Sequence, residues 1–275
     1  MLGAVIGDIV GSIYEGGRAE SRTVPLFGMN VTPTDDSVCT LAIAEAILDE
    51  LPPATARYAR WLKQWGREFP AAGYGRDFKN WLSRASDAAY GSYGNGALMR
   101  VSPAIALSRT ETEARHRAHA ATIITHDHEL SVAAVDLYAQ ALWMALAGKG
   151  RDDVCAFLEG KGVSRHSVDT AHRLGEFHIR ADETLSDVLS CLSEAHDFES
   201  LMRECLYHGG DTDTLCAVAG PLGEVLWGIP PALVDAAWPI LPPRMQSTLL
   251  DEYEALAQIH PRIWGLPDEA FGDAQ

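Results

Sequence analysis

Two short acidic clusters contain the residues of this chain that are best suited to chemistry. Residues 34–37 (Thr-Asp-Asp-Ser) are echoed about 175 residues later by residues 211–214 (Asp-Thr-Asp-Thr). Carboxylate and hydroxyl oxygens with no cysteine or histidine among them suit a hard cation such as Mg²⁺, Mn²⁺ or Ca²⁺. One cation can hardly neutralise four carboxylates, so we predict a two-metal site if the fold brings the clusters together.

Helix capping is an alternative explanation for the same residues. Both clusters lie just before apolar stretches with helical spacing, and the second cluster follows Gly209 and Gly210. Asp and Thr often begin helices by accepting hydrogen bonds from free backbone N–H groups. The repetition of the same residue types at two predicted helix starts favours metal binding over capping alone.

The N-terminal segment combines glycines and polar residues at helical spacing. Three glycines recur every four residues, at Gly3, Gly7 and Gly11. Glycine inside a helix costs about 1 kcal/mol relative to alanine, so the repeat indicates a smooth face on which another helix packs closely. Asp8, Ser12 and Glu15 project from a different face of the same predicted helix. Glu15 is either a site residue or a surface carboxylate at the helix end.

A glycine-rich loop covers residues 90–100 (YGSYGNGALMR). Three glycines within six residues, with Ser92 and Asn95 between them, let backbone N–H groups approach a ligand closely. Such a loop entering a helix can hold phosphate groups, although a simple turn is the alternative. The spacing matches neither a Walker A loop nor a dinucleotide-binding fingerprint.

Residues 125–128 (Thr-His-Asp-His) bring two histidines together just before a predicted buried helix. A His-x-His pair without cysteine or glutamate at ligand spacing is a weak zinc signature. A loop at a site entrance, where one histidine hydrogen-bonds a substrate, fits better, and exposed turn histidines are the alternative. The remaining histidines show no ligand spacing and are predicted to be mostly surface or interhelical groups: His116, His119, His166, His172, His178, His196, His208 and His260.

Composition limits the class of protein. The chain has 275 residues, 47% of them hydrophobic, which suffices for one large domain or two small ones. Its net charge of −16 argues against broad nucleic-acid binding. Five dispersed cysteines without Cys-x-x-Cys spacing predict reduced thiols in a cytoplasm. The apolar start has no basic leader and is interrupted by Asp8, and every long apolar stretch carries charge, so neither a signal peptide nor a membrane span is expected.

Helices must position these groups, because strand-like alternation is nearly absent. We expect one helix directly after the first acidic cluster, a capped helix over residues 110–125 and an apolar central helix over 130–146. Helical spacing also covers residues 54–65, 167–178, 184–195, 198–207 and 244–258. Pro221 should kink or restart the helix that follows the second cluster. The prediction is one all-α domain over residues 1–267 with a flexible C-terminal tail at 268–275.

Taken in chain order, five segments of the sequence resemble the ADP-ribosylglycohydrolase family. They are Gly-Asp-x-x-Gly-Ser-x-x-Glu at 7–15, residues 34–37, Gly-Asn-Gly-x-x-Met-Arg at 94–100, Thr-His at 125–126 and Gly-Gly-Asp-Thr-Asp-Thr at 209–214. The resemblance spans residues 2 to about 230, nearly the whole predicted domain. Ser37 stands where threonine is usual and keeps the hydroxyl. The family includes dinitrogenase reductase-activating glycohydrolase and the ADP-ribosylserine and ADP-ribosylarginine hydrolases.

The resemblance implies a compact multi-helix bundle with a binuclear Mg²⁺ or Mn²⁺ centre in a cleft. The metal ligands that it implies are Thr34, Asp35, Asp36, Asp211, Asp213 and Thr214. The substrate-binding residues that it implies are Gly91, Ser92, Tyr93, Gly94, Asn95 and His126, with the glycine loop on the diphosphate of ADP-ribose. Glu15 occupies the position of an acidic residue that gates the site in the serine-directed branch, so Glu15 and Asp36 are the catalytic candidates.

The implied reaction is metal-dependent removal of ADP-ribose from a modified acceptor by cleavage at C1″ of the distal ribose. The expected acceptor is a protein side chain, a small molecule is the other candidate, and ADP-ribose is the product. Two other interpretations remain open. One is a non-catalytic ADP-ribose-binding or crystallin-like structural protein, and the other is an all-α metallo-phosphohydrolase that uses His126 and Asp127. No membrane partner is expected, and the expected location is the cytoplasm.

Overall fold

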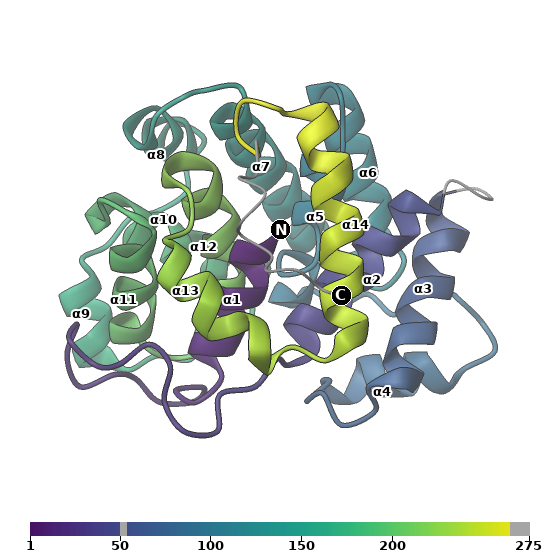
Figure 1. Cartoon of the computed structure of the whole chain (residues 1–275), viewed down its shortest axis with the longest axis horizontal. Coiled ribbons are helices and arrows are strands. Elements are labelled where there is room, and N and C mark those ends of the chain that lie inside the picture. Colours follow the sequence, from purple (N-terminus) through teal and green to yellow (C-terminus); the bar gives the residue numbers. More distant parts are fainter. Residues whose placement is uncertain (50–53, 265–275) are drawn as a thin grey trace.

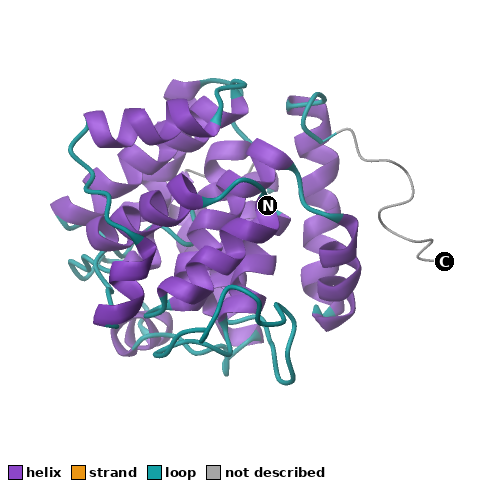
Figure 2. Ribbon diagram, turned by 90° about the vertical axis from the view of Figure 1, so that its left-hand side faces the viewer, coloured by secondary structure: helices purple, strands orange, loops and turns teal. Residues whose placement is uncertain are grey.

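A computed structural model of the chain describes residues 1–49 and 54–264. Helices dominate these residues and no β-strand occurs among them, which confirms the all-α prediction (Figure 2). Strand-like pairing within the described chain is limited to two isolated bridges, Gly17 with Gly210 and Gly94 with Arg180. The predicted tail at 268–275 lies outside the described residues, as do the last residues of the predicted 1–267 domain.

The described residues form fourteen α-helices and two short 3₁₀ helices. In chain order they are α1 (Leu2–Gly11), α2 (Asp35–Leu48), α3 (Ala54–Glu68), α4 (Arg76–Ser83), η1 (Asn95–Ala97), α5 (Ser102–Ala106), α6 (Glu111–Ile123), α7 (Glu129–Leu146), α8 (Arg151–Gly160), α9 (Val168–Leu174), α10 (Ala181–Glu194), α11 (Phe198–His208), α12 (Thr212–Trp227), α13 (Pro231–Ala237), η2 (Trp238–Ile240) and α14 (Pro243–Ile259). In Figure 1, α1 lies near the middle, with α9 and α11 at one side and α3 and α4 at the other.

The glycine repeat of α1 brings this helix into backbone contact with α12. A Cβ atom added to Gly3, Gly7 or Gly11 would lie 2.2–2.5 Å from a backbone oxygen of α12. Gly220 makes the reciprocal approach, because a Cβ atom there would lie 2.0 Å from Gly3 O. Every residue of α1 is buried. The predicted close packing is therefore confirmed, and it places the end of α1 beside the start of α12.

Two helical predictions differ clearly from the structure. The predicted helix over 167–178 corresponds to α9, which ends at Leu174 because Gly175 adopts the left-handed conformation at φ +64°. Helix α12 continues through Pro221, so the predicted restart is wrong. Proline removes one backbone hydrogen bond, and the Tyr138 hydroxyl, which donates to Val218 O at 2.8 Å, supports α12 in the adjacent turn.

Helices α6 and α7 lie where they were predicted, and they differ from the prediction only in detail. Thr110 caps α6 by accepting the N–H of Glu113 at 3.2 Å, while the Glu113 carboxylate accepts the N–H of Arg109 at 2.8 Å. Helix α7 is buried on one face only, with Tyr138 inside the core and Ala133 exposed. None of the helices in residues 1–49 and 54–264 has both the length and the apolar character needed to cross a membrane.

Candidate metal centre and substrate cleft

The N-termini of α2 and α12 bring the two acidic clusters together. Carboxylate oxygens of Asp8, Asp36 and Asp213 lie within 4.8 Å of one another, and so do those of Glu15, Asp211 and Asp213. Asp213 belongs to both groups, which makes them one continuous acidic centre. Both clusters begin helices, where the partial positive charge of the helix N-terminus favours ionised carboxylates.

Asp8 is an acidic residue to which the sequence analysis gave no role. It is fully buried in α1 and accepts hydrogen bonds from the residues on either side of the first Asp pair. Thr34 donates through its N–H (2.8 Å) and its hydroxyl (2.7 Å), and Ser37 donates through its N–H (3.0 Å) and its hydroxyl. These bonds hold the start of α2 against α1 and thereby position Asp35 and Asp36. The signal in the sequence was a carboxylate within an otherwise apolar helix.

Within the described residues, the side chain of Thr34 makes a helix-capping hydrogen bond, whereas the carboxylate of Asp211 does not. Thr34 Oγ1 accepts the N–H of Asp36 at 3.3 Å and so caps α2. Asp211 is the N-cap residue of α12, yet its side chain makes no capping bond in the described chain. Its Oδ2 instead accepts a hydrogen bond from Asn95 Nδ2 at 2.8 Å. This bond ties the glycine-rich loop to the second acidic cluster.

Burial and mutual repulsion disfavour the ionised forms of these carboxyl groups. Burial, followed by the charge of Asp213, raises the pKa of Asp36 well above its usual value. Burial also raises the pKa of Asp213 to about 10 and that of Asp35 to about 7, each with contributions from neighbouring carboxylates. Asp36 Oδ1 is buried and receives no hydrogen bond from the described residues. Bound cations would compensate these charges, and donor atoms that are all oxygen fit Mg²⁺ or Mn²⁺.

A cavity of about 510 Å³ opens beside the acidic centre. Most of the predicted metal ligands line it: Asp35, Asp36, Asp211, Asp213 and Thr214. Thr34 directs its hydroxyl to Asp8. Thr214 donates its hydroxyl hydrogen to Asp36 Oδ2 at 3.3 Å, which links the two clusters directly. The structure thus brings all six predicted ligands to one place, and their metal-binding role stays a prediction.

Glu15 also lines the cavity, at its exposed edge. Helix α1 ends at Gly11, so Glu15 lies in the following turn instead of on the predicted helical face. Burial, followed by the charge of Asp211, raises the pKa of Glu15 above its usual value. A carboxyl group in this position can exchange protons with a substrate while remaining in contact with the acidic centre.

The glycine-rich loop supplies one wall of the cavity through Ser92, Gly94 and Asn95. The N–H groups of these three residues and of Gly91 donate to acceptors within the protein. They are therefore engaged before any ligand arrives, so the Ser92 hydroxyl is better placed than these amides to contact a substrate. Gly91 and Tyr93 are exposed, and neither is among the residues that line the cavity in the described chain. The binding roles of all five loop residues stay predictions.

His126 presents a hydrogen-bond donor to the cavity. Arg100 Nη2 donates to the Thr125 hydroxyl and approaches His126 Nδ1 at 3.4 Å, which leaves the hydroxyl to donate to Nδ1 at 2.8 Å. The ring proton is then on Nε2, which faces the glycine-rich loop 3.1 Å from the position of a Cβ atom on Gly96. Burial, followed by the charge of Arg100, holds the pKa of His126 well below its usual value. The imidazole is therefore neutral and can donate to a ligand oxygen.

Several further cavity residues received no role from the sequence, among them Arg100, Phe177 and Ile179. Arg100 is 1% exposed and burial lowers its pKa. A buried guanidinium beside the cavity favours an anionic ligand. Phe177 and Ile179 are 48% and 50% exposed and offer apolar surface beside the polar groups. Arg100 was visible only as the end of the Gly-Asn-Gly-x-x-Met-Arg segment, and nothing in the local sequence marked the other two.

The chain matches the family model for ADP-ribosylglycohydrolases over residues 1–264. The protein belongs to the ADP-ribosylglycohydrolase family. This match extends from α1 to the last described residue and includes both acidic clusters. Membership in the family supports removal of ADP-ribose by hydrolysis.

Individual relatives are similar over nearly the full length of the chain. ADP-ribosylhydrolase ARH3 of Mus musculus is 24% identical, and the alignment covers 96% of this chain and 90% of the mouse protein. ADP-ribosylarginine hydrolase Tri1 of Pseudomonas putida (strain GB-1) is also 24% identical, with coverage of 96% and 80%. A solved structure described as an ADP-ribosylglycohydrolase-related protein complex is 25% identical, covers 94% of this chain and 95% of its own, and has a TM-score of 0.71.

Proposed function

We propose that this ADP-ribosylglycohydrolase cleaves the C1″ glycosidic bond between ADP-ribose and a modified acceptor, with two Mg²⁺ or Mn²⁺ ions in the acidic centre. The observation that carries the proposal is the convergence of the two clusters on a cavity that also presents Arg100 and the neutral imidazole of His126. Carboxylates suit cations, whereas the other two groups suit the anionic diphosphate of ADP-ribose. One cavity therefore contains complementary groups for both parts of the chemistry.

The six residues that would hold the ions are Thr34, Asp35, Asp36, Asp211, Asp213 and Thr214. When bound, divalent cations supply Lewis acidity that polarises the ribose hydroxyls and a water molecule. The protein positions the ligands from two sides. Asp8 fixes the α2 cluster through four hydrogen bonds, and Asn95 fixes Asp211. Such outer partners preset ligand geometry and support metal affinity.

Two carboxyl groups are the candidates for moving protons. Glu15 lies at the exposed edge of the cavity with a raised pKa, where an acceptor would leave, so it can protonate the leaving group or take a proton from water. Asp36 Oδ1 receives no hydrogen bond from the described residues and is the second candidate for accepting a proton from water. Both residues line the cavity.

The ADP part of the substrate supplies remote binding energy that orients the distal ribose. We assign its diphosphate to the wall formed by Ser92, His126 Nε2–H and Arg100. A protein side chain is the proposed acceptor, since Glu15 and the half-exposed Phe177 lie where the cavity meets solvent. All five cysteines are buried and none forms a disulfide, which fits the proposed cytoplasmic location.

A panel of substrates tests the proposed reaction and its acceptor. Purified protein is incubated in Mg²⁺ or Mn²⁺ with proteins ADP-ribosylated on arginine or on serine, and with a small-molecule ADP-riboside, and the products are separated by chromatography. We expect free ADP-ribose and an unmodified protein acceptor. Release of AMP or inorganic phosphate without ADP-ribose would favour the phosphohydrolase interpretation instead. ADP-ribose binding without turnover of any substrate would favour the non-catalytic one.

His126→Ala is expected to weaken ADP-ribose binding about tenfold, because one hydrogen bond to a charged oxygen contributes about 1.5 kcal/mol. Isothermal titration with ADP-ribose measures the dissociation constant. His119→Ala is the matched control, since His119 is exposed on α6 and lines no part of the proposed site. Equal affinities of wild type and His126→Ala would contradict the assigned role of the imidazole.

A further inference from the structure

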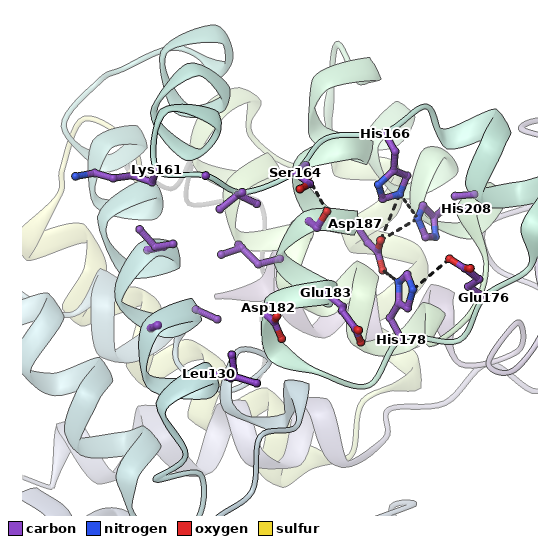
Figure 3. Close-up of a pocket in the computed structure, with 18 of the residues that line it drawn as sticks. Leu130, Lys161, Ser164, His166, Glu176, His178, Asp182, Glu183, Asp187 and His208 are labelled. Carbon is purple, nitrogen blue, oxygen red and sulfur yellow. Dashed lines mark hydrogen bonds and ion pairs between the residues drawn. The ribbon is translucent and has the colours of Figure 1, made fainter.

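A second cavity, of about 530 Å³, is bordered by residues of the segment 176–178 (Figure 3). Side chains of residues 176–179 alternate between the two cavities. Phe177 and Ile179 line the cavity at the acidic centre, whereas Glu176 and His178 line the second one. The second cavity shares no lining residue with the first in the described chain.

Three potential ligand atoms converge at the wall of this second cavity (Figure 3). His166 Nε2 and His208 Nε2 are 3.2 Å apart. Asp187 Oδ1 is 3.4 Å from His166 Nε2 and 3.3 Å from His208 Nε2. The sequence analysis found no ligand spacing for either histidine, and about twenty residues separate each of them from Asp187 in the chain. The fold nevertheless places them around one point.

The outer nitrogen of each ring fixes the tautomer. His208 Nδ1 lies 3.1 Å from Gly209 O, which can only accept, so Nδ1 carries the ring proton. His166 Nδ1 lies 3.3 Å from Ser190 Oγ, whose own hydrogen is donated to Ser186 O at 2.8 Å. Ser190 Oγ therefore accepts from His166 Nδ1. With Nδ1 as the protonated nitrogen of each ring, both Nε2 atoms offer lone pairs, and the two atoms lie 3.2 Å apart.

Asp187 adds a negative charge at the same point. Asp187 is only 4% exposed, and its Oδ1 receives no hydrogen bond of normal geometry from the described residues. Oδ2 accepts from His178 Nδ1 at 2.8 Å. Two nitrogen lone pairs and a buried carboxylate oxygen in contact repel one another unless a cation lies between them.

We propose that His166, Asp187 and His208 bind a Zn²⁺ ion at a site separate from the acidic centre. Zinc bonds of about 2.0–2.1 Å in tetrahedral geometry separate neighbouring ligand atoms by about 3.3–3.4 Å. The three measured separations of 3.2, 3.3 and 3.4 Å match that spacing. Two imidazoles and one carboxylate suit zinc, and a water from the adjoining cavity completes the four ligands.

The outer contacts resemble those that orient metal ligands in proteins. Each ring donates its Nδ1–H to an oxygen, and His178 holds the second oxygen of Asp187. The ion would join α10, the end of α11 and the segment before α9, since these elements carry the three ligands. His208 lies three residues before Asp211, so the zinc site would also brace the approach to the second acidic cluster.

Metal titration of the full chain tests this proposal without reference to hydrolysis. Protein stripped with a chelator is titrated with Zn²⁺ in competition with a chromophoric chelator, and Co²⁺ is added separately to record its visible spectrum. We expect one tight Zn²⁺ per chain and the visible absorption of four-coordinate Co²⁺. His166→Ala and Asp187→Asn should each weaken Zn²⁺ binding at least about 10²-fold, because changes to outer partners alone cost 10–100-fold.

Two controls separate this site from other metal-binding groups. His196→Ala removes a histidine whose side chain is 76% exposed and should leave the tight Zn²⁺ unchanged. Asp36→Asn alters the acidic centre and should also keep the tight Zn²⁺. Circular dichroism establishes that the variants fold, and His166→Gln serves if His166→Ala does not. Absence of tight Zn²⁺ in folded wild type, or equal affinity in His166→Ala, would overturn the proposal, as would loss of the tight ion in Asp36→Asn alone.

Discussion

Asp36→Asn is expected to lower the turnover of ADP-ribosylated substrate by at least about 10²-fold and, at the same time, to stabilise the metal-free protein. The loss of turnover follows because the amide removes one negative charge and one ligand oxygen from the acidic centre. Removal of a single preorganised polar group from an active site costs about 10²–10³-fold. Steady-state release of ADP-ribose, measured at saturating Mg²⁺ or Mn²⁺, gives the first effect.

The gain in stability has a separate physical cause. Asp36 is buried near Asp8 and Asp213, and its Oδ1 receives no hydrogen bond from residues 1–49 and 54–264. Without cations, folding must bring these like charges together out of water, which costs free energy. The isosteric amide removes part of that repulsion. Urea denaturation in the presence of chelator should therefore show a higher midpoint for Asp36→Asn than for wild type.

Asp251→Asn is the matched control, because Asp251 is exposed on α14. It should change neither turnover nor the urea midpoint measurably. Wild-type turnover in Asp36→Asn would contradict the assignment of this residue to the catalytic centre. An unchanged or lower urea midpoint in chelator would instead contradict the view that unpaired carboxylate charge destabilises the metal-free site.

Gly7→Ala is expected to reduce the free energy of unfolding by about 2 kcal/mol. The new Cβ would lie 2.2 Å from Cys216 O and 2.5 Å from Cys216 C, so α1 and α12 must separate. Overpacking a core costs about 1–3 kcal/mol and sometimes more, and rigid backbone atoms on both sides make relaxation expensive. This cost outweighs the gain of about 1 kcal/mol in helix propensity.

Gly160→Ala provides the control for helix propensity. Gly160 belongs to α8, and a Cβ atom added there would meet nothing within 4 Å. Its substitution should be neutral or slightly stabilising. Thermal and urea unfolding measure both variants. Gly7→Ala should also lower turnover, since separation of the two helices shifts Asp8 away from Asp213. A Gly7→Ala protein as stable as wild type would contradict the described contact between α1 and α12.

Patterns that repeat along the chain predicted much of the fold and the centre of the site. The glycine repeat of α1 predicted a close helix contact, because glycines inside a helix reduce its stability and their small size lets another helix pack closely. The acidic clusters could be paired because both consist of the same hard ligands at helix starts. Gly175 was a local signal for the end of α9, but the predicted range of 167–178 ran past it.

Contacts between distant segments were harder to predict. The role of Asp8 depends on residues 12–34 returning the chain so that Thr34 and Ser37 reach α1. No local pattern encodes that return. The convergence of His166, Asp187 and His208 had no signature either, because rules for metal ligands search for short spacings and these residues lie on three different elements. The engaged amides of the glycine-rich loop likewise depend on partners such as Ile179 O.

The most direct measurement of the central proposal is ADP-ribose release by chelator-stripped protein before and after divalent cations are restored. The substrate is a protein ADP-ribosylated with the linkage that the panel identifies, and Zn²⁺ alone is included because of the proposed second site. We expect turnover to disappear in chelator, to return with Mg²⁺ or Mn²⁺, and not to return with Zn²⁺ alone. Undiminished release of ADP-ribose in the presence of chelator would contradict a metal-dependent acidic centre.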